Sequence, residues 1–231
     1  MQQLALDLKL ADFALFEIFY SGANGPAVHA IKQAAITGGQ QVHWIWGRQG
    51  SGRSHLLQAA VAAAGAKNQR CAWLPLGNPA EFMPAMLEGM GMLDLVCVDD
   101  IDAVAGDAEW ERQLFRMFED LKANNGRLLV SAKSAPAEAG FSLRDLESRL
   151  ASGPTWKLHA LNDEELYEAL KLRARWRGLE LSEDAGQYLL RRVTRDAATL
   201  FAVLDTADQA ALAAQRKLTV PFLRTVLESA R

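Results

Sequence analysis

The chain has 231 residues, of which 50% are hydrophobic and 23% charged, and its formal net charge is −3. This composition is typical of a globular protein with one large domain or two small ones, and it excludes a strongly basic nucleic-acid-binding domain. No run of 18 apolar residues and no signal-peptide pattern is present, so we expect neither a membrane span nor a leader. Cys71 and Cys97 lie in apolar runs without metal-ligand spacing, which favours reduced thiols in a cytoplasmic protein.

The first elements expected along the chain are an arm, a helix and a strand. Residues 3–8 alternate with period two and the alternation then stops, which predicts an extended arm over residues 1–12. Apolar residues on one helical face predict a helix over 25–38, which ends at two glycines. A strand is expected over 42–46.

A glycine-rich loop then connects this strand to a helix expected over 53–65. It has the P-loop spacing G-x-x-x-x-G-K-[ST], with arginine at the lysine position. Glycines let backbone N–H groups turn toward an anion, and the following helix directs the positive end of its dipole to the same place. The residues expected to bind a nucleotide here are Gly47, Gly50, Ser51, Gly52, Arg53, Ser54 and His55.

Two residues of this loop decide what chemistry we expect. Arg53 presents a planar fork where lysine presents a compact charge, so we predict nucleotide binding with weak intrinsic hydrolysis. The hydroxyl of Ser54 is expected to ligate Mg²⁺. The alternative is a plain glycine-rich turn between a strand and a helix.

Strands and helices alternate over the next hundred residues. This alternation predicts an α/β fold with a parallel, doubly wound sheet, which we expect to occupy residues 13–160. The expected strands cover 71–76, 95–98, 127–131 and 156–158, and the expected helices cover 79–89, 107–123 and 142–150.

Asp99 and Asp100 follow the strand 95–98 directly and have the pattern of a Walker B motif. We expect Asp99 to hold Mg²⁺ through water and Asp100 to polarise an attacking water. Open α/β sheets bind ligands at the carboxyl ends of their strands, which places this pair near the P-loop. The alternative is a solvated acidic turn.

From residue 161 onward every expected element is a helix, over 163–177, 183–194, 196–214 and 220–229. Ser182 and Asp196 are predicted to cap the second and third of these helices. The pattern predicts a separate helical lid over 161–231. The basic side chains at 171, 173, 175 and 177 favour a solvated helix face over a nucleic-acid contact.

A P-loop sheet followed by a helical lid resembles the AAA+ ATPases. Four segments are similar to the bacterial replication initiator DnaA and its relatives: residues 16–24, the loop W-G-x-x-G-S-G-[RK]-[ST]-H-L-L, residues 98–102 and residues 148–150. The arginine in the P-loop and the ending Q-R-K-L-T-V-P-F (215–222) resemble most closely the regulatory inactivators of the DnaA/Hda family. The resemblance covers nearly the whole chain.

The resemblance implies further site residues. Phe19 and Asn24 would lie beside the adenine of ADP or another nucleoside diphosphate, bound with Mg²⁺. Arg149 matches the family's arginine finger, which reaches into the nucleotide site of a neighbouring subunit. The alternative is a surface arginine paired with Asp145 or Glu147, within one helical turn.

The family's two sensor positions are less clear in this sequence. The arginine of sensor 2 falls at Ala198, which has no charge to sense a phosphate, and Arg195 lies three residues earlier. At sensor 1 either Ser131 or Lys133 could face the nucleotide. Nucleotide sensing through the lid is therefore in doubt.

The arm resembles the Q-L-x-L-P-L peptide that docks on the sliding clamp of the replicase. Gln3 would enter a polar notch, and Leu4, Leu6 and Leu8 an apolar pocket. Asp7 stands where proline is common, which is expected to weaken the contact because the free peptide is more flexible. The alternative is a frayed amino terminus.

These features together predict a regulator of chromosome replication initiation. It would dock on the DNA-loaded clamp, contact DNA only indirectly and stimulate ATP hydrolysis by DnaA through Arg149. No helix-turn-helix follows the lid, so we do not expect origin recognition as in DnaA. An autonomous ATPase acting on DNA and a clamp adaptor with a structural nucleotide remain alternatives, and assembly into a homo-oligomer stays open.

Overall fold

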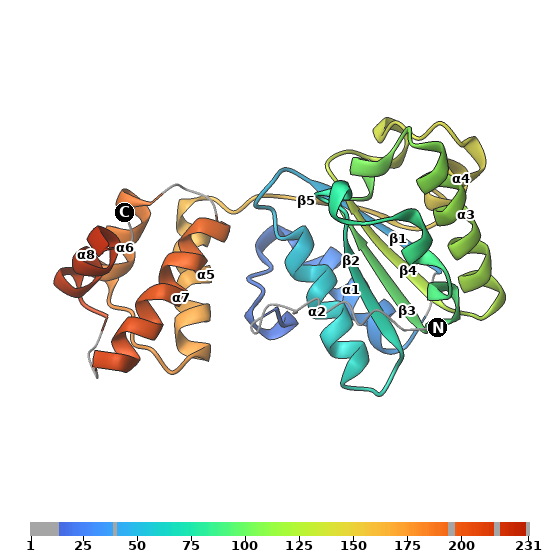
Figure 1. Cartoon of the computed structure of the whole chain (residues 1–231). Helices are drawn as coiled ribbons and strands as arrows, with labels where there is room; N and C mark the ends of the chain where they lie inside the picture. The colour runs from blue at the N-terminus through green and yellow to red at the C-terminus, as the bar shows by residue number, and fades with distance from the viewer. Residues whose placement is uncertain (1–13, 39–40, 194–196, 215–217, 230–231) are drawn as a thin grey trace. The chain divides into compact units, whose positions relative to one another are not determined.

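The computed structural model describes residues 14–38, 41–193, 197–214 and 218–229. The expected arm, with Gln3, Leu4, Leu6 and Leu8, lies outside these ranges. The chain forms two compact units (Figure 1). The first contains residues 23–159 and the described residues up to Glu17, and the second contains 18–22 and the chain from Ala160 onward.

The first unit is built on a five-stranded parallel sheet with the strand order β2-β3-β4-β1-β5. Every residue of β3 and β4 is buried, as expected for strands that are covered on both faces. The predicted parallel sheet is therefore confirmed. Its strands are β1 (Val42–Gly47), β2 (Cys71–Pro75), β3 (Leu95–Asp99), β4 (Arg127–Ala132) and β5 (Thr155–Leu158).

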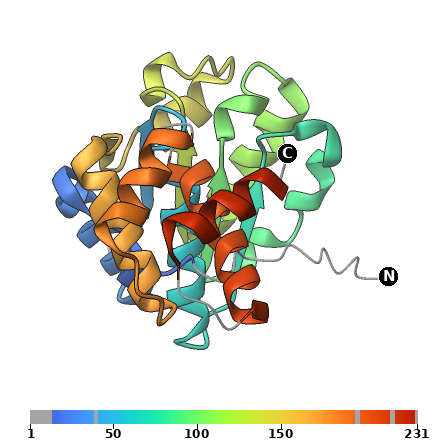
Figure 2. The same ribbon diagram turned by 90° about the vertical axis from the view of Figure 1, so that its left-hand side faces the viewer.

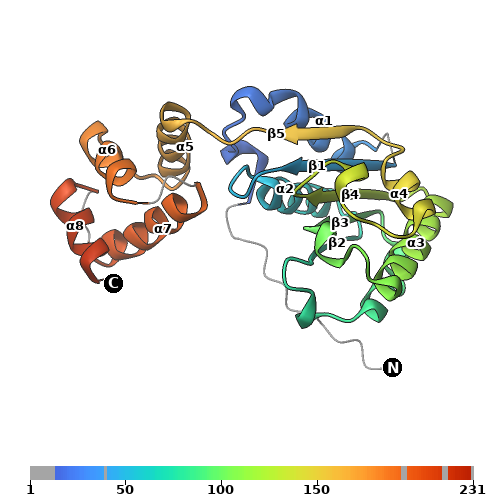
Figure 3. The ribbon, with the colours of Figure 1, turned by 90° about the horizontal axis from the view of Figure 1, so that it is seen from above.

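Two layers of helices cover this sheet. α1 (Gly25–Ile36) and α2 (Arg53–Gly65) pack together on one side, and α3 (Ala108–Ala123) and α4 (Arg144–Leu150) on the other (Figures 1 and 3). The side chains that α3 and α4 bury against the sheet include Trp110, Leu114, Phe118, Leu146 and Leu150. The P-loop connects the carboxyl end of β1 to the start of α2.

The prediction of a helix over 79–89 is wrong. The segment instead forms two short 3₁₀ turns, Pro79–Glu81 and Pro84–Leu87, and a third turn, Met90–Met92, follows it. Pro84 lacks an N–H for a helical hydrogen bond and forces the residue before it into an extended conformation, so no helix can continue through it.

The lid consists of α5 (Asp163–Trp176), α6 (Glu183–Arg192), α7 (Ala197–Ala214) and α8 (Val220–Ser229), seen together in Figure 2. The four helices enclose a core of their own, so the predicted helical lid is confirmed. Ser182 accepts a hydrogen bond from the N–H of Ala185, as predicted for a cap, whereas Asp196 lies outside the described residues. None of the described helices has the length and apolar character that a membrane crossing requires.

The basic run on α5 is not the solvated face that the sequence suggests. Arg173 is 9% exposed and binds Asp205 of α7, and the guanidinium of Arg177 binds both Asp205 and Asp208 at 2.8 Å. Of the arginines in the run, Arg175 is exposed. The run therefore joins two helices within the lid.

Candidate functional site

The P-loop lies where β1 ends beside β5. Gly47 has no room for a side chain, because a Cβ would lie 2.6 Å from the carbonyl oxygen of Leu158 and 2.9 Å from Ser51 Oγ. Gly50 and Gly52 have φ angles of 78° and 93°, in the left-handed region that favours glycine. The loop conformation therefore depends on the glycines that the motif supplies.

The loop has polar groups that fit an anion. Ser51 is 6% exposed and its buried hydroxyl has no hydrogen-bond partner among the described residues. α2 begins at Arg53 without a side-chain cap on its first N–H groups, so the helix terminus is suited to a phosphate. Ser54 is exposed in the first turn of this helix. The ring of His55 instead lies 2.9 Å from the carbonyl oxygen of Leu15.

The side chain of Arg53 points back toward the sheet. The sequence motif had predicted that it lies beside a phosphate. It is 7% exposed, and Nη1 donates hydrogen bonds to the carbonyls of Gly47, at 2.9 Å, and of Ala132. Nη2 donates to Asp100 Oδ1 at 2.8 Å. We call these three bonds the Arg53 bridge, since they join the ends of β1 and β4 to the residue after β3.

The two aspartates of the Walker B motif are brought together with Ser131. The Ser131 hydroxyl donates to Asp99 Oδ1 and accepts a hydrogen bond from the N–H of Asp100 at 2.9 Å. Ser131 is fully buried and Lys133 is exposed, so of the two sensor 1 candidates it is Ser131 that contacts the acidic pair.

Asp100 combines unusual backbone geometry with a shifted pKa. Its φ of 52° lies in the left-handed region, which a non-glycine residue seldom adopts. Burial raises the pKa of its carboxyl, the charge of Asp99 raises it further, and Arg53 opposes both effects. The carboxylate is thus kept charged partly by its arginine partner.

The proposed Mg²⁺ ligands Ser54 and Asp99 lie on the same edge of the sheet, at the start of α2 and the end of β3. Among the described residues no group of three or more His, Cys, Asp or Glu side chains forms a metal cluster. A magnesium ion here would therefore take most of its ligands from phosphate oxygens and water, as is usual for Mg²⁺.

The two residues expected beside the adenine have different surroundings. Asn24 is 3% exposed, and its side-chain amide donates to the carbonyl of His159 at 2.9 Å and accepts from the same residue's N–H at 2.8 Å. The side chain thus links the start of α1 to the chain after β5. Phe19 belongs to the segment 18–22 of the second unit.

Arg149, the expected arginine finger, lies in the last turn of α4. Its Nε donates to Glu119 of α3 at 3.0 Å, so its ion pair is with neither Asp145 nor Glu147. The Arg149 side chain is 45% exposed, and an exposed pair of this kind contributes about 0–1 kcal/mol. Arg149 can therefore leave Glu119 at little cost.

Sequence reasoning missed Glu111, a carboxylate in α3 that is 1% exposed. Its oxygens accept hydrogen bonds from the N–H groups of Gly106, at 2.7 Å, Ser142, at 2.9 Å, and Leu143, at 2.6 Å. The bonds fix the start of α4, the helix that carries Arg149. The sequence did contain a signal that Glu111 is buried. Glu111 lies at helical spacing on the same face of α3 as the apolar residues Leu114, Phe118 and Leu121.

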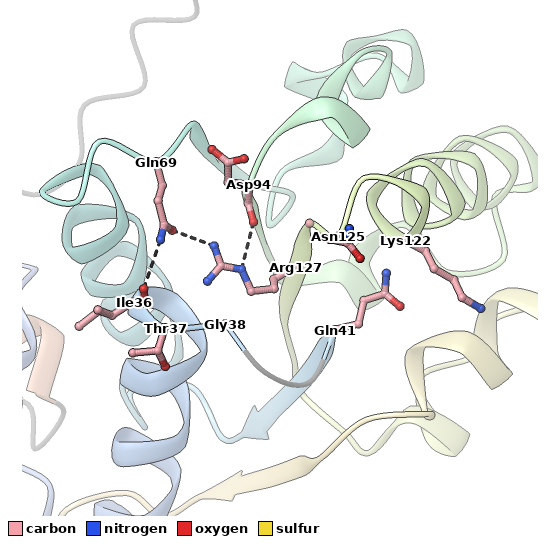
Figure 4. A pocket seen from close by; sticks show the side chains of 10 residues that line it. Ile36, Thr37, Gly38, Gln41, Gln69, Asp94, Lys122, Asn125 and Arg127 are labelled. Atoms are coloured by element: carbon pink, nitrogen blue, oxygen red, sulfur yellow. Dashed lines mark hydrogen bonds between the residues drawn. The ribbon is translucent and has the colours of Figure 1, made fainter.

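A polar pocket of about 700 Å³ opens at the opposite edge of the sheet (Figure 4). Arg127 is buried there, and burial lowers the pKa of its guanidinium. Its N–H groups donate to the carbonyls of Ala34 and Asp94 and to the side chain of Gln69, which secures the end of α1. The pocket is lined by Ile36, Thr37, Gly38, Gln41, Gln69, Asp94, Lys122, Asn125, Gly126 and Arg127.

Solved structures share this fold. Domain III of DnaA from Thermotoga maritima is similar with a TM-score of 0.76 at 20% identity, over 96% of this chain and 98% of that one. DnaA bound to AMPPCP and single-stranded DNA is similar with a TM-score of 0.71 at 22% identity, over 85% of this chain and 65% of that one. The RuvB branch migration motor of T. maritima follows with 0.61 at 14% identity, over 91% of this chain and 68% of that one.

The chain spans 64% of the length of a DNA replication initiation factor that it also resembles, with a TM-score of 0.70 at 20% identity over 85% of this chain. Two family models match the sequence itself. The lid domain of Hda matches residues 163–227, and the bacterial DnaA ATPase domain matches residues 10–160, which is more than half of the chain. The chain therefore belongs to the DnaA/Hda family of AAA+ nucleotide-binding proteins, which is related to replication initiation.

Proposed function

We propose that this protein limits the initiation of chromosome replication by stimulating ATP hydrolysis in DnaA. The observation that carries the proposal is the placement of Arg149 on α4, where it is 45% exposed and paired with Glu119 at the surface. An exposed arginine with a weak partner can enter the nucleotide site of a neighbouring molecule and stabilise charge on a transferring phosphoryl group. The match of the Hda lid model to residues 163–227 supports this function.

In this proposal the protein holds ADP or another nucleoside diphosphate, with Mg²⁺, at its own P-loop. The N–H groups around Gly50 and Gly52, the hydroxyl of Ser51 and the start of α2 would hold the phosphates, and Ser54 and Asp99 would orient the metal. When bound, the diphosphate supplies negative charge that this cradle neutralises. The solved structure of DnaA bound to AMPPCP, which has a similar fold, supports nucleotide binding.

Docking on the sliding clamp completes the proposal. Residues 3–8 carry the glutamine and leucines of a clamp-binding peptide. Two proteins held on one clamp and DNA would meet at a raised effective concentration, so a weak contact between Arg149 and DnaA would suffice. Origin-bound DnaA would thus be reached only where a clamp is loaded.

The decisive experiment measures hydrolysis of DnaA-bound ATP in the presence of clamp, DNA and this protein. Arg149→Ala is expected to reduce the stimulation about 1000-fold or more, because arginine fingers supplied in trans contribute roughly 10³–10⁵ in rate. Arg144→Ala, which removes an exposed arginine of the same helix, is the matched control and should keep the stimulation. Equal stimulation by Arg149→Ala and wild type would exclude the mechanism.

Two other outcomes would replace the proposal. Rapid ATP hydrolysis by this protein alone, lost in Asp100→Asn, would indicate an autonomous ATPase. Full regulation by a variant that binds no nucleotide, combined with loss of regulation in Leu4→Ala/Leu6→Ala, would indicate a clamp adaptor. The Arg53 bridge favours the regulator over the autonomous ATPase, because it engages the motif arginine and Asp100 with each other.

A further inference from the structure

We infer that Arg53 is a positioning residue rather than a phosphate ligand: the Arg53 bridge stays intact when a nucleotide is bound, and it restrains Asp100. The phosphates would then be held by the loop N–H groups, the hydroxyl of Ser51 and the start of α2. The inference rests on the nucleotide site of the proposed function but is independent of any action on DnaA.

Arg53 would have to leave three partners in order to reach a phosphate. Its guanidinium serves two backbone carbonyls and one carboxylate, and only 8% of its side chain is exposed. A buried acceptor that loses its donor without gaining water is destabilised by the full cost of its desolvation. A swing of Arg53 toward a phosphate would leave the acceptors at the ends of β1 and β4 without this donor.

The charges around Asp100 also favour an Arg53 that stays in the bridge. Asp99 and Asp100 are adjacent acids at the end of β3, and Asp102 follows two residues later. Arg53 is the cation that forms an ion pair with Asp100, at 2.8 Å. If Arg53 left, the Asp100 carboxylate would face the acids beside it and a bound diphosphate without that partner.

The Arg53 bridge requires arginine at the position where the P-loop motif has lysine. Arginine carries five N–H donors in a rigid planar fork, so one guanidinium can serve acceptors from three chain segments at once. The ammonium of lysine is a compact point charge on a flexible stem. The residue type that departs from the P-loop motif is therefore the type that the bridge requires.

The bridge has a consequence for the chemistry of this protein. In the bridge Asp100 Oδ1 already accepts a hydrogen bond from Arg53 at 2.8 Å, so this oxygen is not free to orient a water molecule. The carboxylate can serve as a fixed structural acceptor instead.

The test is a change of Arg53 in an Asp100→Asn background. If Arg53 does not touch phosphate, Arg53→Gln/Asp100→Asn should bind a fluorescent ADP analogue within about threefold of Asp100→Asn. A phosphate ligand would instead lose tenfold or more, or about 1.4 kcal/mol, and that result would overturn the inference. Arg48→Gln/Asp100→Asn, which removes the exposed arginine of the same loop, is the matched control.

A second measurement covers the case in which the double variant does not fold. Arg53→Lys keeps the charge but lacks the fork, so its unfolding temperature without nucleotide should fall by about 3 °C or more. Arg48→Lys should leave that temperature unchanged. An unaltered unfolding temperature of Arg53→Lys would overturn the inference. Both measurements use this protein alone, so their failure is distinguishable from loss of DnaA stimulation in Arg149→Ala.

Discussion

At the scale of single residues, the burial of His43 makes the stability of the protein depend on pH. His43 on β1 is 5% exposed, and its Nδ1 accepts a hydrogen bond from Trp156 Nε1 at 3.3 Å. Burial lowers the pKa of the imidazole, so the folded protein prefers the neutral ring. Below the unfolded pKa of about 6.5 the unfolded chain binds the proton more readily, and stability is lost as the pH falls.

We therefore predict that His43→Gln, which keeps a hydrogen-bond acceptor, reduces the acid sensitivity of the protein. Between pH 7 and pH 5 the unfolding temperature of the wild type should fall by about 2–4 °C more than that of the variant. Thermal unfolding followed by circular dichroism measures this difference. His29→Gln, which changes an exposed histidine of α1, should follow the wild type, and parallel pH curves for His43→Gln would refute the assignment.

At this scale the sequence could predict residue types but not partners. The P-loop glycines and the Ser182 cap depend on local backbone geometry, which short motifs record. Arg53 with Asp100 and Arg149 with Glu119 pair across 47 and 30 positions, respectively. Such pairs depend on how distant elements pack, so the loop motif predicted a phosphate contact where the structure has an internal ion pair.

Among the elements, α3 determines where α4 lies. Glu111 binds three backbone N–H groups, two of them at the start of α4, and Glu119 binds Arg149 in its last turn. The helix α4 has only seven residues, which is too short to be stable by itself. Its position therefore depends on the contacts that α3 supplies.

We predict that Glu111→Ala lowers the free energy of unfolding by about 3 kcal/mol, because it leaves buried N–H groups unpaired. Glu111→Gln keeps one acceptor oxygen and should lose less, about 1–2 kcal/mol. Urea unfolding measures both values. Glu109→Ala changes an exposed glutamate in the first turn of α3, and its free energy of unfolding should stay within about 0.5 kcal/mol of the wild type. A loss of that small size in Glu111→Ala would show that α4 does not depend on this carboxylate.

The predicted elements succeeded where periodicity and flanking residues agreed, as in α2 and α3. They failed over 79–89, where helix-forming residues are present but Pro84 interrupts them. Composition favoured a helix there, and the backbone restriction of a single residue prevailed.

On the scale of the whole molecule, each unit has a core of its own. In the lid, Asp205 of α7 forms ion pairs with Arg173 at 3.0 Å and with Arg177 at 2.8 Å, and both arginines are largely buried. Removal of one partner from a shielded pair costs more than removal from an exposed pair, because it leaves a charge behind.

We predict that Asp205→Ala destabilises the lid by about 1–3 kcal/mol. Hydrogen exchange should accelerate in peptides from α5 to α8 and remain unchanged in the buried strands β3 and β4. Glu168→Ala, which removes the exposed partner of Lys171 on α5, is the control and should change lid exchange little. Equal acceleration in both units would mean that the chain opens as one body.

The fold class and the family could be predicted from the alternation of elements and from motifs that cover nearly the whole chain. The assignment of residues 18–22 to the second unit could not, because it depends on where five residues pack rather than on their pattern. The same limit applies to the buried role of the α5 arginines.

The strand order also has a consequence for how the protein is made. β1 lies between β4 and β5, whose first residues follow 80 or more positions later in the chain. During synthesis the apolar strand with Trp44 and Trp46 therefore leaves the ribosome well before either neighbour exists. Parallel pairing across such separations is slow and leaves surface open to aggregation. Productive expression should thus benefit from chaperones that shield the nascent chain until β4 and β5 have been made.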